Sequence, residues 1–216
     1  MTARTDLRLA QLICSRLCHD LAGVSGAIAN GIELAAESSP DADAEALALV
    51  GESARQVNAR IAFFRAAFGA STPAQALADA AVLAQGYLAG GPVSLAPVAG
   101  PAGAARLSSE GVRLALVLTM VAAGCLPRGG LVHIHAAPLA EGIGASLTAT
   151  GKGAAARPEI VAALEGRLAP DSASPREIHA VWAGYLAGAL GGKIELLAEE
   201  GKVRLGVMLP RAQTLG

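Results

Sequence analysis

A helical pattern that fills nearly all of the first 70 residues constrains the fold of this chain more than any other feature. Small and apolar residues recur at helical spacing from Leu7 to Glu37, and the run ends in Ser38-Ser39-Pro40-Asp41, a turn followed by capping residues. A second helical run, residues 42–68, stops at Gly69. Two long helices joined by so short a connection are expected to lie antiparallel. The sequence therefore predicts an N-terminal helical hairpin.

The pattern of apolar and polar residues changes after Pro73. Short runs typical of β-strands alternate with helical runs, a pattern that favours helices packed over one face of a mixed sheet. We therefore predict an α+β fold in two domains, a helical hairpin over residues 1–70 and an α/β sandwich over residues 71–216. The strands are expected at 93–98, 130–136, 145–150, 193–198 and 202–209, and the helices at 72–88, 108–125, 157–165 and 175–190.

The composition excludes several classes of protein. Hydrophobic residues make up 53% of the 216 residues and charged residues only 16%, so the chain can bury an apolar core and is not expected to be disordered. Seventeen lysines and arginines stand against eighteen acidic residues, for a net charge of −1. Because there is no overall basic field to attract phosphate backbones or anionic lipids, neither nucleic acid nor a membrane is expected as a partner.

The hydropathy pattern does not favour a membrane anchor. The longest clean apolar run, Leu114–Leu126, is too short to span a bilayer, and glycines and prolines interrupt the longer uncharged stretch 80–105. Charged residues precede any apolar run at the N-terminus, which is not typical of a signal peptide. Three cysteines give no disulfide framework. These features predict a cytoplasmic protein.

The first helical run carries an apolar seam on one face and a histidine on the other. At 100° per residue, His19 points away from the seam, so we expect an exposed imidazole. Its surroundings are small, and two glycines within a helix cost up to about 2 kcal/mol relative to alanine, which the close approach of a partner protein would explain. The predicted seam comprises Ala10, Cys14, Leu17, Leu21, Val24, Ile28, Gly31 and Ala35, and the predicted partner-facing positions comprise Ser15, Ala22, Gly23, Gly26 and Asn30.

An exposed histidine next to a carboxylate can do covalent chemistry. Imidazole is nucleophilic and can hold a transferred group. The adjacent Asp20 can orient the ring or take its proton. Arg16, one helical turn earlier, can offer a cation to a phosphoryl group. The residues alone leave open the alternative of a surface histidine with no role.

Five short motifs follow one another along the chain: residues 15–21 (SRLCHDL) continuing to 26–34, then 52–55, 63–69, 126–130 and 185–192. In this order they resemble the ChpT-type histidine phosphotransferases, alphaproteobacterial relatives of histidine kinases. The resemblance implies that His19 is the phosphoacceptor. It also implies a homodimer in which two hairpins form a four-helix bundle.

The same resemblance implies the partners and the source of the metal. The donor would be the receiver domain of a hybrid histidine kinase (CckA-like), and the acceptors would be response-regulator receivers (CtrA-like and CpdR-like). The phosphorylated aspartate of a receiver is held by the receiver's own Mg²⁺. We therefore expect this chain to need no cofactor of its own.

The second domain is similar to the Bergerat-type ATPase domain of histidine kinases, with its nucleotide-binding residues replaced. Active kinases place Mg²⁺-ligating asparagines on the helix that corresponds to residues 114–130. By register from the glycine pair that ends this segment, those positions are Val117 and Val121. Ala149 stands where the next kinase box has its adenine-binding aspartate, although the glycines of that box remain. The resemblance implies a domain that neither binds nor hydrolyses ATP.

Other potential ligands and motifs do not indicate a further site. The segment 150–153 (TGKG) lacks both the earlier glycine and the hydroxyl residue of a phosphate-binding loop. Cys14 and Cys18 share a helix face, and His133 and His135 share one face of a strand. Neither pair has the further ligands that a structural metal needs, so no metal is expected.

The aromatic residues are expected to serve mainly as core. Phe64 and Phe68 are expected to pack the core of the hairpin, and Trp182 to pack in an amphipathic helix. Phe63, one residue before Phe64, points to another helix face and is the aromatic residue that we expect to face a partner.

These observations predict a histidine phosphotransferase of a His–Asp phosphorelay, which accepts a phosphoryl group on His19 from a receiver aspartate and passes it to other receivers. One alternative is a dimeric scaffold that uses the same face without phosphate chemistry. The other is an ATP-dependent histidine kinase, against which Val117, Val121 and Ala149 argue.

Overall fold

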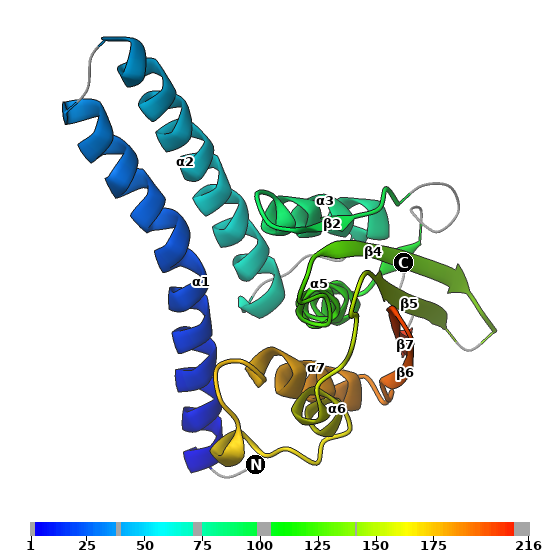
Figure 1. Ribbon diagram of the computed structural model, residues 1–216. Helices are drawn as coiled ribbons and strands as arrows, with labels where there is room; N and C mark the ends of the chain where they lie inside the picture. The colour runs from blue at the N-terminus through cyan, green and yellow to red at the C-terminus, as the bar shows by residue number, and fades with distance from the viewer. Residues whose placement is uncertain (1–2, 38–39, 71–74, 99–104, 141, 210–216) are drawn as a thin grey trace, which may run out of the picture.

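The N-terminal hairpin is the first feature of the computed structural model, which describes residues 3–37, 40–70, 75–98, 105–140 and 142–209. Helix α1 (Ala3–Glu37) and helix α2 (Pro40–Phe68) pack antiparallel, and their joined end stands clear of the rest of the molecule (Figure 1). Gly31 allows the two helices to approach closely, because a Cβ there would lie 2.7 Å from Cγ2 of Val50. The predicted hairpin is confirmed.

The apolar seam predicted for α1 is wrong in its N-terminal half. Ala10 and Cys14 are exposed, whereas Leu9 and Leu12 are buried. The reason is that α1 changes partner along its length. Its C-terminal half packs on α2, whereas its N-terminal part lies against helix α7 (Ile178–Ala189) and the short 3-10 helix η1 (Pro170–Ser172) (Figure 1). The seam positions Val24 and Gly31 are buried, and Leu17, Leu21, Ile28 and Ala35 are half-buried.

The remainder of the chain builds a five-stranded mixed sheet, as the sequence predicted. Its strand order is β2-β4-β5-β7-β6, with β2 parallel to β4 and every other pair antiparallel. The two-residue strands β1 (Gln75–Ala76) and β3 (Arg106–Leu107), which were not predicted, form a separate antiparallel pair. The sheet strands are β2 (Val93–Leu95), β4 (Gly130–Pro138), β5 (Ile143–Thr150), β6 (Glu195–Glu199) and β7 (Lys202–Leu209).

Helices cover one face of this sheet, and α5 (Ser109–Gly124) is the central one (Figure 1). Every residue from 111 to 122 of α5 is buried. Alternate residues of β5 and β7 also point into this core, as a half-buried sheet requires. Helices α3 (Leu77–Leu88), α6 (Pro158–Leu164) and α7 complete the layer. None of the described helices is both long and apolar enough to cross a membrane.

The glycines near residues 129 and 151 have a structural explanation. Gly129 has φ +81°, and a Cβ on it would lie 2.4 Å from the Pro92 carbonyl oxygen. A Cβ on Gly151 would lie 2.5 Å from the carbonyl oxygen of Gly129. These backbones therefore meet more closely than side chains allow. Gly151, one of the glycines of the kinase-like box, lies here at the end of β5 and packs against the turn that leads into β4.

Candidate functional site

His19 lies on α1, at the level where the hairpin meets the second part of the molecule. Its side chain is 83% exposed, and its Nδ1 lies 3.3 Å from Oδ1 of Asp20. A ring that donates its Nδ1 proton to this carboxylate keeps its lone pair on Nε2. Nε2 is therefore the nitrogen available to an incoming group.

Asp20 is held more firmly than its exposed neighbour. Its side chain is only 11% exposed, and Oδ2 accepts a hydrogen bond from Nε of Arg16 at 2.9 Å. The Tyr87 hydroxyl approaches the same oxygen at 3.5 Å. Arg60, from α2, donates to the backbone carbonyl of Asp20. Arg16 and Tyr87 hold the carboxylate and Arg60 holds the backbone of the same residue, so the carboxylate can orient the ring of His19.

The charge of the Asp20 carboxylate acts to raise the pKa of both Arg16 and Tyr87. Burial acts to lower the pKa of Arg16, but the Asp20 carboxylate and Tyr87 more than compensate and raise that pKa above its ordinary value. Arg16 therefore remains a cation. Burial raises the pKa of Tyr87, and the Asp20 charge raises it further. Tyr87 therefore remains a hydroxyl donor.

The predicted partner-facing positions of α1 form one exposed stripe beside His19. Ser15, Ala22, Gly23, Gly26 and Asn30 are all exposed. A Cβ added to Gly23 or Gly26 would meet no atom within 4 Å. Nothing within the described chain therefore requires glycine at these two positions.

The prediction for Phe63 is wrong. This side chain is 0% exposed and stacks on the Tyr87 ring, with 4.3 Å between ring centroids. Phe64 is buried beside it, and its centroid lies 5.7 Å from that of Tyr87. The reason is that the C-terminal half of α2 packs on α3 and α5 as well as on α1, so two of its faces are buried. Phe63 supports the residue that contacts Asp20 and cannot contact a partner itself.

A cavity of about 650 Å³ opens beside His19. Its walls come from α1 and from the loop before α7, two segments far apart in the sequence. We refer to it as the His19 cavity; it is lined by Ser15, Arg16, His19, Ser174, Pro175 and Arg176. Arg176 is exposed. The sequence did not predict Ser174, Pro175 and Arg176 as site residues, nor Tyr87 and Arg60, because no local spacing links them to His19.

The residues of α5 that face a cavity are not the two that the kinase register indicated. Val117 and Val121 are 0% and 1% exposed and belong to the core. Met120, Ala123 and Gly124 instead line a cavity of about 400 Å³ between α5, α6 and α7, which we call the α5–α7 cavity. Val117 and Val121, which stand at the Mg²⁺-ligating positions by the kinase register, therefore do not line this cavity. Neither set of side chains carries an oxygen that could ligate Mg²⁺.

The potential metal ligands remain dispersed. Cys14 and Cys18 are exposed free thiols, and His133 and His135 are exposed on β4. Within the described ranges, histidine, cysteine and acidic side chains form no group of three or more that could hold a metal ion.

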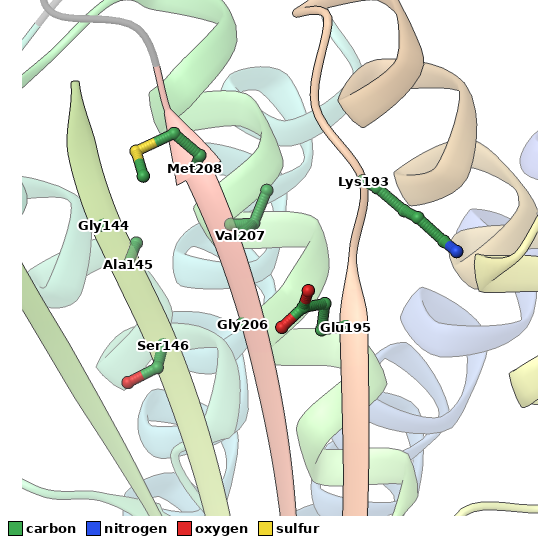
Figure 2. Close-up of a pocket in the computed structure, with 8 residues that line it drawn as sticks. All are labelled: Gly144, Ala145, Ser146, Lys193, Glu195, Gly206, Val207 and Met208. Carbon is green, nitrogen blue, oxygen red and sulfur yellow. The ribbon is translucent and has the colours of Figure 1, made fainter. Parts of the chain in front are cut away.

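A third cavity, of about 490 Å³, lies over β5, β7 and the segment that leads into β6 (Figure 2). Gly144 on β5 and Gly206 on β7 have no side chains to fill this space. Gly206 pairs with Ser146 of β5 on one side and with Glu195 of β6 on the other. None of its described lining residues was predicted as a site residue from the sequence, and none is a histidine or a cysteine. We assign no function to it.

Comparison with known families matches the second part of the chain. A family model described as "Histidine phosphotransferase C-terminal domain" matches residues 77–202. This range covers more than half of the chain and lies inside the segment 71–216 that the sequence indicated as a second domain.

Individual proteins agree with this match. The Protein phosphotransferase ChpT of Brucella abortus (strain 2308) is 38% identical over 133 residues, which are 60% of this chain and 61% of that protein. A solved structure described as a bacterial phosphotransferase superposes with a TM-score of 0.78 at 29% identity, covering 96% of this chain and 97% of the other. The superposition on this solved structure confirms the α+β fold over nearly the whole length of the chain.

Proposed function

This chain belongs to the ChpT-type histidine phosphotransferase family, and from that premise we propose that it carries a phosphoryl group on His19 in a His–Asp phosphorelay. The observation that carries the proposal is the exposed imidazole whose Nδ1 contacts the fixed carboxylate of Asp20. The alternative of a surface histidine with no role leaves the network that holds Asp20 unexplained.

The proposed reaction is an in-line transfer between two side chains. The Nε2 lone pair of His19 attacks the phosphorus of a receiver's aspartyl phosphate, the P–O bond to that aspartate breaks, and the aspartate leaves as a carboxylate. The phosphorylated ring keeps its Nδ1 proton and becomes a cation. The carboxylate of Asp20, 3.3 Å from Nδ1, stabilises this cation or takes its proton.

Two arginines of this chain are placed to stabilise the phosphoryl oxygens during transfer. Arg16 and Arg176 both line the His19 cavity, and guanidinium groups suit the geometry of phosphate. Arg16 also anchors Asp20. We propose that the receiver supplies Mg²⁺, so that this chain contributes position and charge without a cofactor.

We also propose that the hairpin, residues 1–70, is a dimerisation and phosphotransfer domain and that residues 71–216 form a kinase-ATPase-like domain without ATP binding. Large apolar side chains remain exposed on the hairpin, among them Ile32 at 56% and Leu47 at 63%. Ile32 lies about 140° around α1 from His19 at 100° per residue. A second hairpin packed on that side would bury such residues in a four-helix bundle and leave both His19 rings outside.

The partners that we propose follow from the ChpT-type resemblance. They are a CckA-like hybrid kinase receiver as donor and CtrA-like and CpdR-like receivers as acceptors. The exposed stripe of small residues beside His19 supports the docking of a globular domain there, because small side chains let the receiver's active site approach the imidazole.

The substitution Asp20→Asn tests the role of the carboxylate. Asparagine keeps the shape but cannot neutralise the phosphorylated ring, so we expect the transfer rate from a phosphorylated receiver to fall by about 10²–10⁴-fold. Rapid-quench phosphotransfer measures this rate. Glu52→Gln is the matched control, since Glu52 is another carboxylate of the hairpin that pairs with an arginine, Arg55, at 2.8 Å. Equal rates for wild type and Asp20→Asn would contradict the assignment.

Onward transfer tests the relay function itself. The chain is first labelled by a ³²P-phosphorylated receiver, purified away from it, and mixed with a second, unlabelled receiver. We expect the label to leave the chain and to appear on the second receiver within the dead time of manual mixing. Retention of the label on this chain with every receiver tried would contradict a relay intermediate. Tight receiver binding without any labelling would favour the scaffold.

A further inference from the structure

The α5–α7 cavity gathers positive charge next to the His19 cavity. Three arginines line it, Arg16, Arg157 and Arg176, together with the buried His179. Met120 and Ile160 contribute apolar wall. None of its described lining residues carries a carboxylate. Such a lining favours an anion over a cation or a neutral apolar ligand. The apolar wall would remove part of the water around that anion.

Carboxylates neutralise only two of the three arginines that line this cavity. Nε of Arg16 pairs with Asp20 at 2.9 Å, and Nη1 of Arg157 pairs with Glu177 at 3.2 Å. The guanidinium of Arg176 has no hydrogen-bond or ion-pair partner among the described residues. The cavity therefore keeps an uncompensated positive charge at its lining.

His179 is the second and independent sign of a ligand. The side chain is 4% exposed, yet its Nδ1 has no hydrogen-bond partner in the described part of the chain. Burial, and then the charges of Arg16 and Arg157, lower the pKa of His179 to about 3, so the ring is neutral at neutral pH. A neutral imidazole still has one N–H to donate, and a buried polar group without a partner is unusual enough to need an explanation.

We propose that the α5–α7 cavity binds a phosphoryl oxyanion, either inorganic phosphate or the phosphoryl group of a small phosphomonoester, held by Arg157, Arg176 and His179. The cavity volume of about 400 Å³ admits an ion of this size together with water or a short organic tail. Because Arg16 and Arg176 line both cavities, the bound anion would sit next to the phosphotransfer site. This inference does not depend on the proposed role of His19.

A titration followed through the histidine rings tests the proposal. The full chain, with ¹⁵N-labelled histidine, is titrated with sodium phosphate at pH 7 and, in parallel, with sodium chloride at matched ionic strength. We expect phosphate alone to shift the His179 ring resonances saturably in the millimolar range. A bound anion also screens the ring from the two arginines, so we expect the pKa of His179 to rise in phosphate.

Variants locate the site, and a second ligand identifies the source of the anion. We expect Arg157→Gln to weaken phosphate binding by about tenfold or more and Arg204→Gln, at an exposed position on β7, to leave it unchanged. Glycerol 3-phosphate that binds more tightly than orthophosphate would indicate a phosphomonoester, and the reverse would indicate free phosphate. The absence of a saturable His179 shift in the folded wild type, or equal weakening by both variants, would overturn the proposal.

Discussion

Replacement of His19 by glutamine is expected to abolish phosphoryl transfer from a phosphorylated receiver while leaving the fold intact. Glutamine cannot hold a phosphoryl group on nitrogen at neutral pH, so we expect the labelling to fall by at least about a thousandfold. The side chain is 83% exposed, and a substitution at such a position changes the free energy of unfolding by no more than about 0.5 kcal/mol. Labelling and urea denaturation of the same preparation measure both quantities.

The control for this experiment is another exposed histidine of the same chain. His135 lies on β4, in the second part of the molecule, and His135→Gln removes an imidazole without touching α1. We expect this variant to be labelled as the wild type is. Residual labelling of His19→Gln at the wild-type level would show that another residue accepts the phosphoryl group.

Replacement of Phe63 by alanine is expected to have the largest effect on stability. Phe63 is fully buried between Phe64 and Tyr87, and loss of a buried phenylalanine costs about 3–5 kcal/mol. The cavity also frees the Tyr87 ring, whose hydroxyl approaches Asp20. We therefore expect slower phosphotransfer by the fraction of Phe63→Ala that remains folded. Urea denaturation gives the first quantity, and transfer under stabilising conditions gives the second.

An exposed apolar residue provides the matched comparison. Val82, on α3, is 67% exposed, so we expect Val82→Ala to change the unfolding free energy by no more than about 0.5 kcal/mol. A loss below about 1 kcal/mol for Phe63→Ala would mean that Phe63 is not the packed link between α2 and α3 that the structure places there.

Periodicity was sufficient to predict the long helices, the five strands of the main sheet and the exposure of His19. The hairpin has only two long helices and one short turn, so its topology follows from local signals. The exposure of His19 follows from helix geometry, because the opposite face carries the buried Val24 and Gly31. The sheet was predictable for the same reason: its strands alternate between core and outer face.

The parts that could not be predicted depend on contacts between distant segments. Ala10 was placed in the core because the seam was extended along one line, whereas the partner of α1 changes from α2 to α7. Phe63 was placed outside because a hairpin helix was expected to bury one face, and α3 buries a second. Arg176 lies 157 residues after His19 in the sequence, and only the fold brings it to the same cavity.

The nature of the phosphoryl donor is the most direct test of the whole account. Wild-type chain is incubated in parallel with a ³²P-labelled phosphorylated receiver and with Mg²⁺ and γ-labelled ATP, and the acid-labile label on the chain is counted. We expect label from the receiver and none from ATP. Label from ATP alone would contradict the relay and would identify the second domain as an active kinase domain.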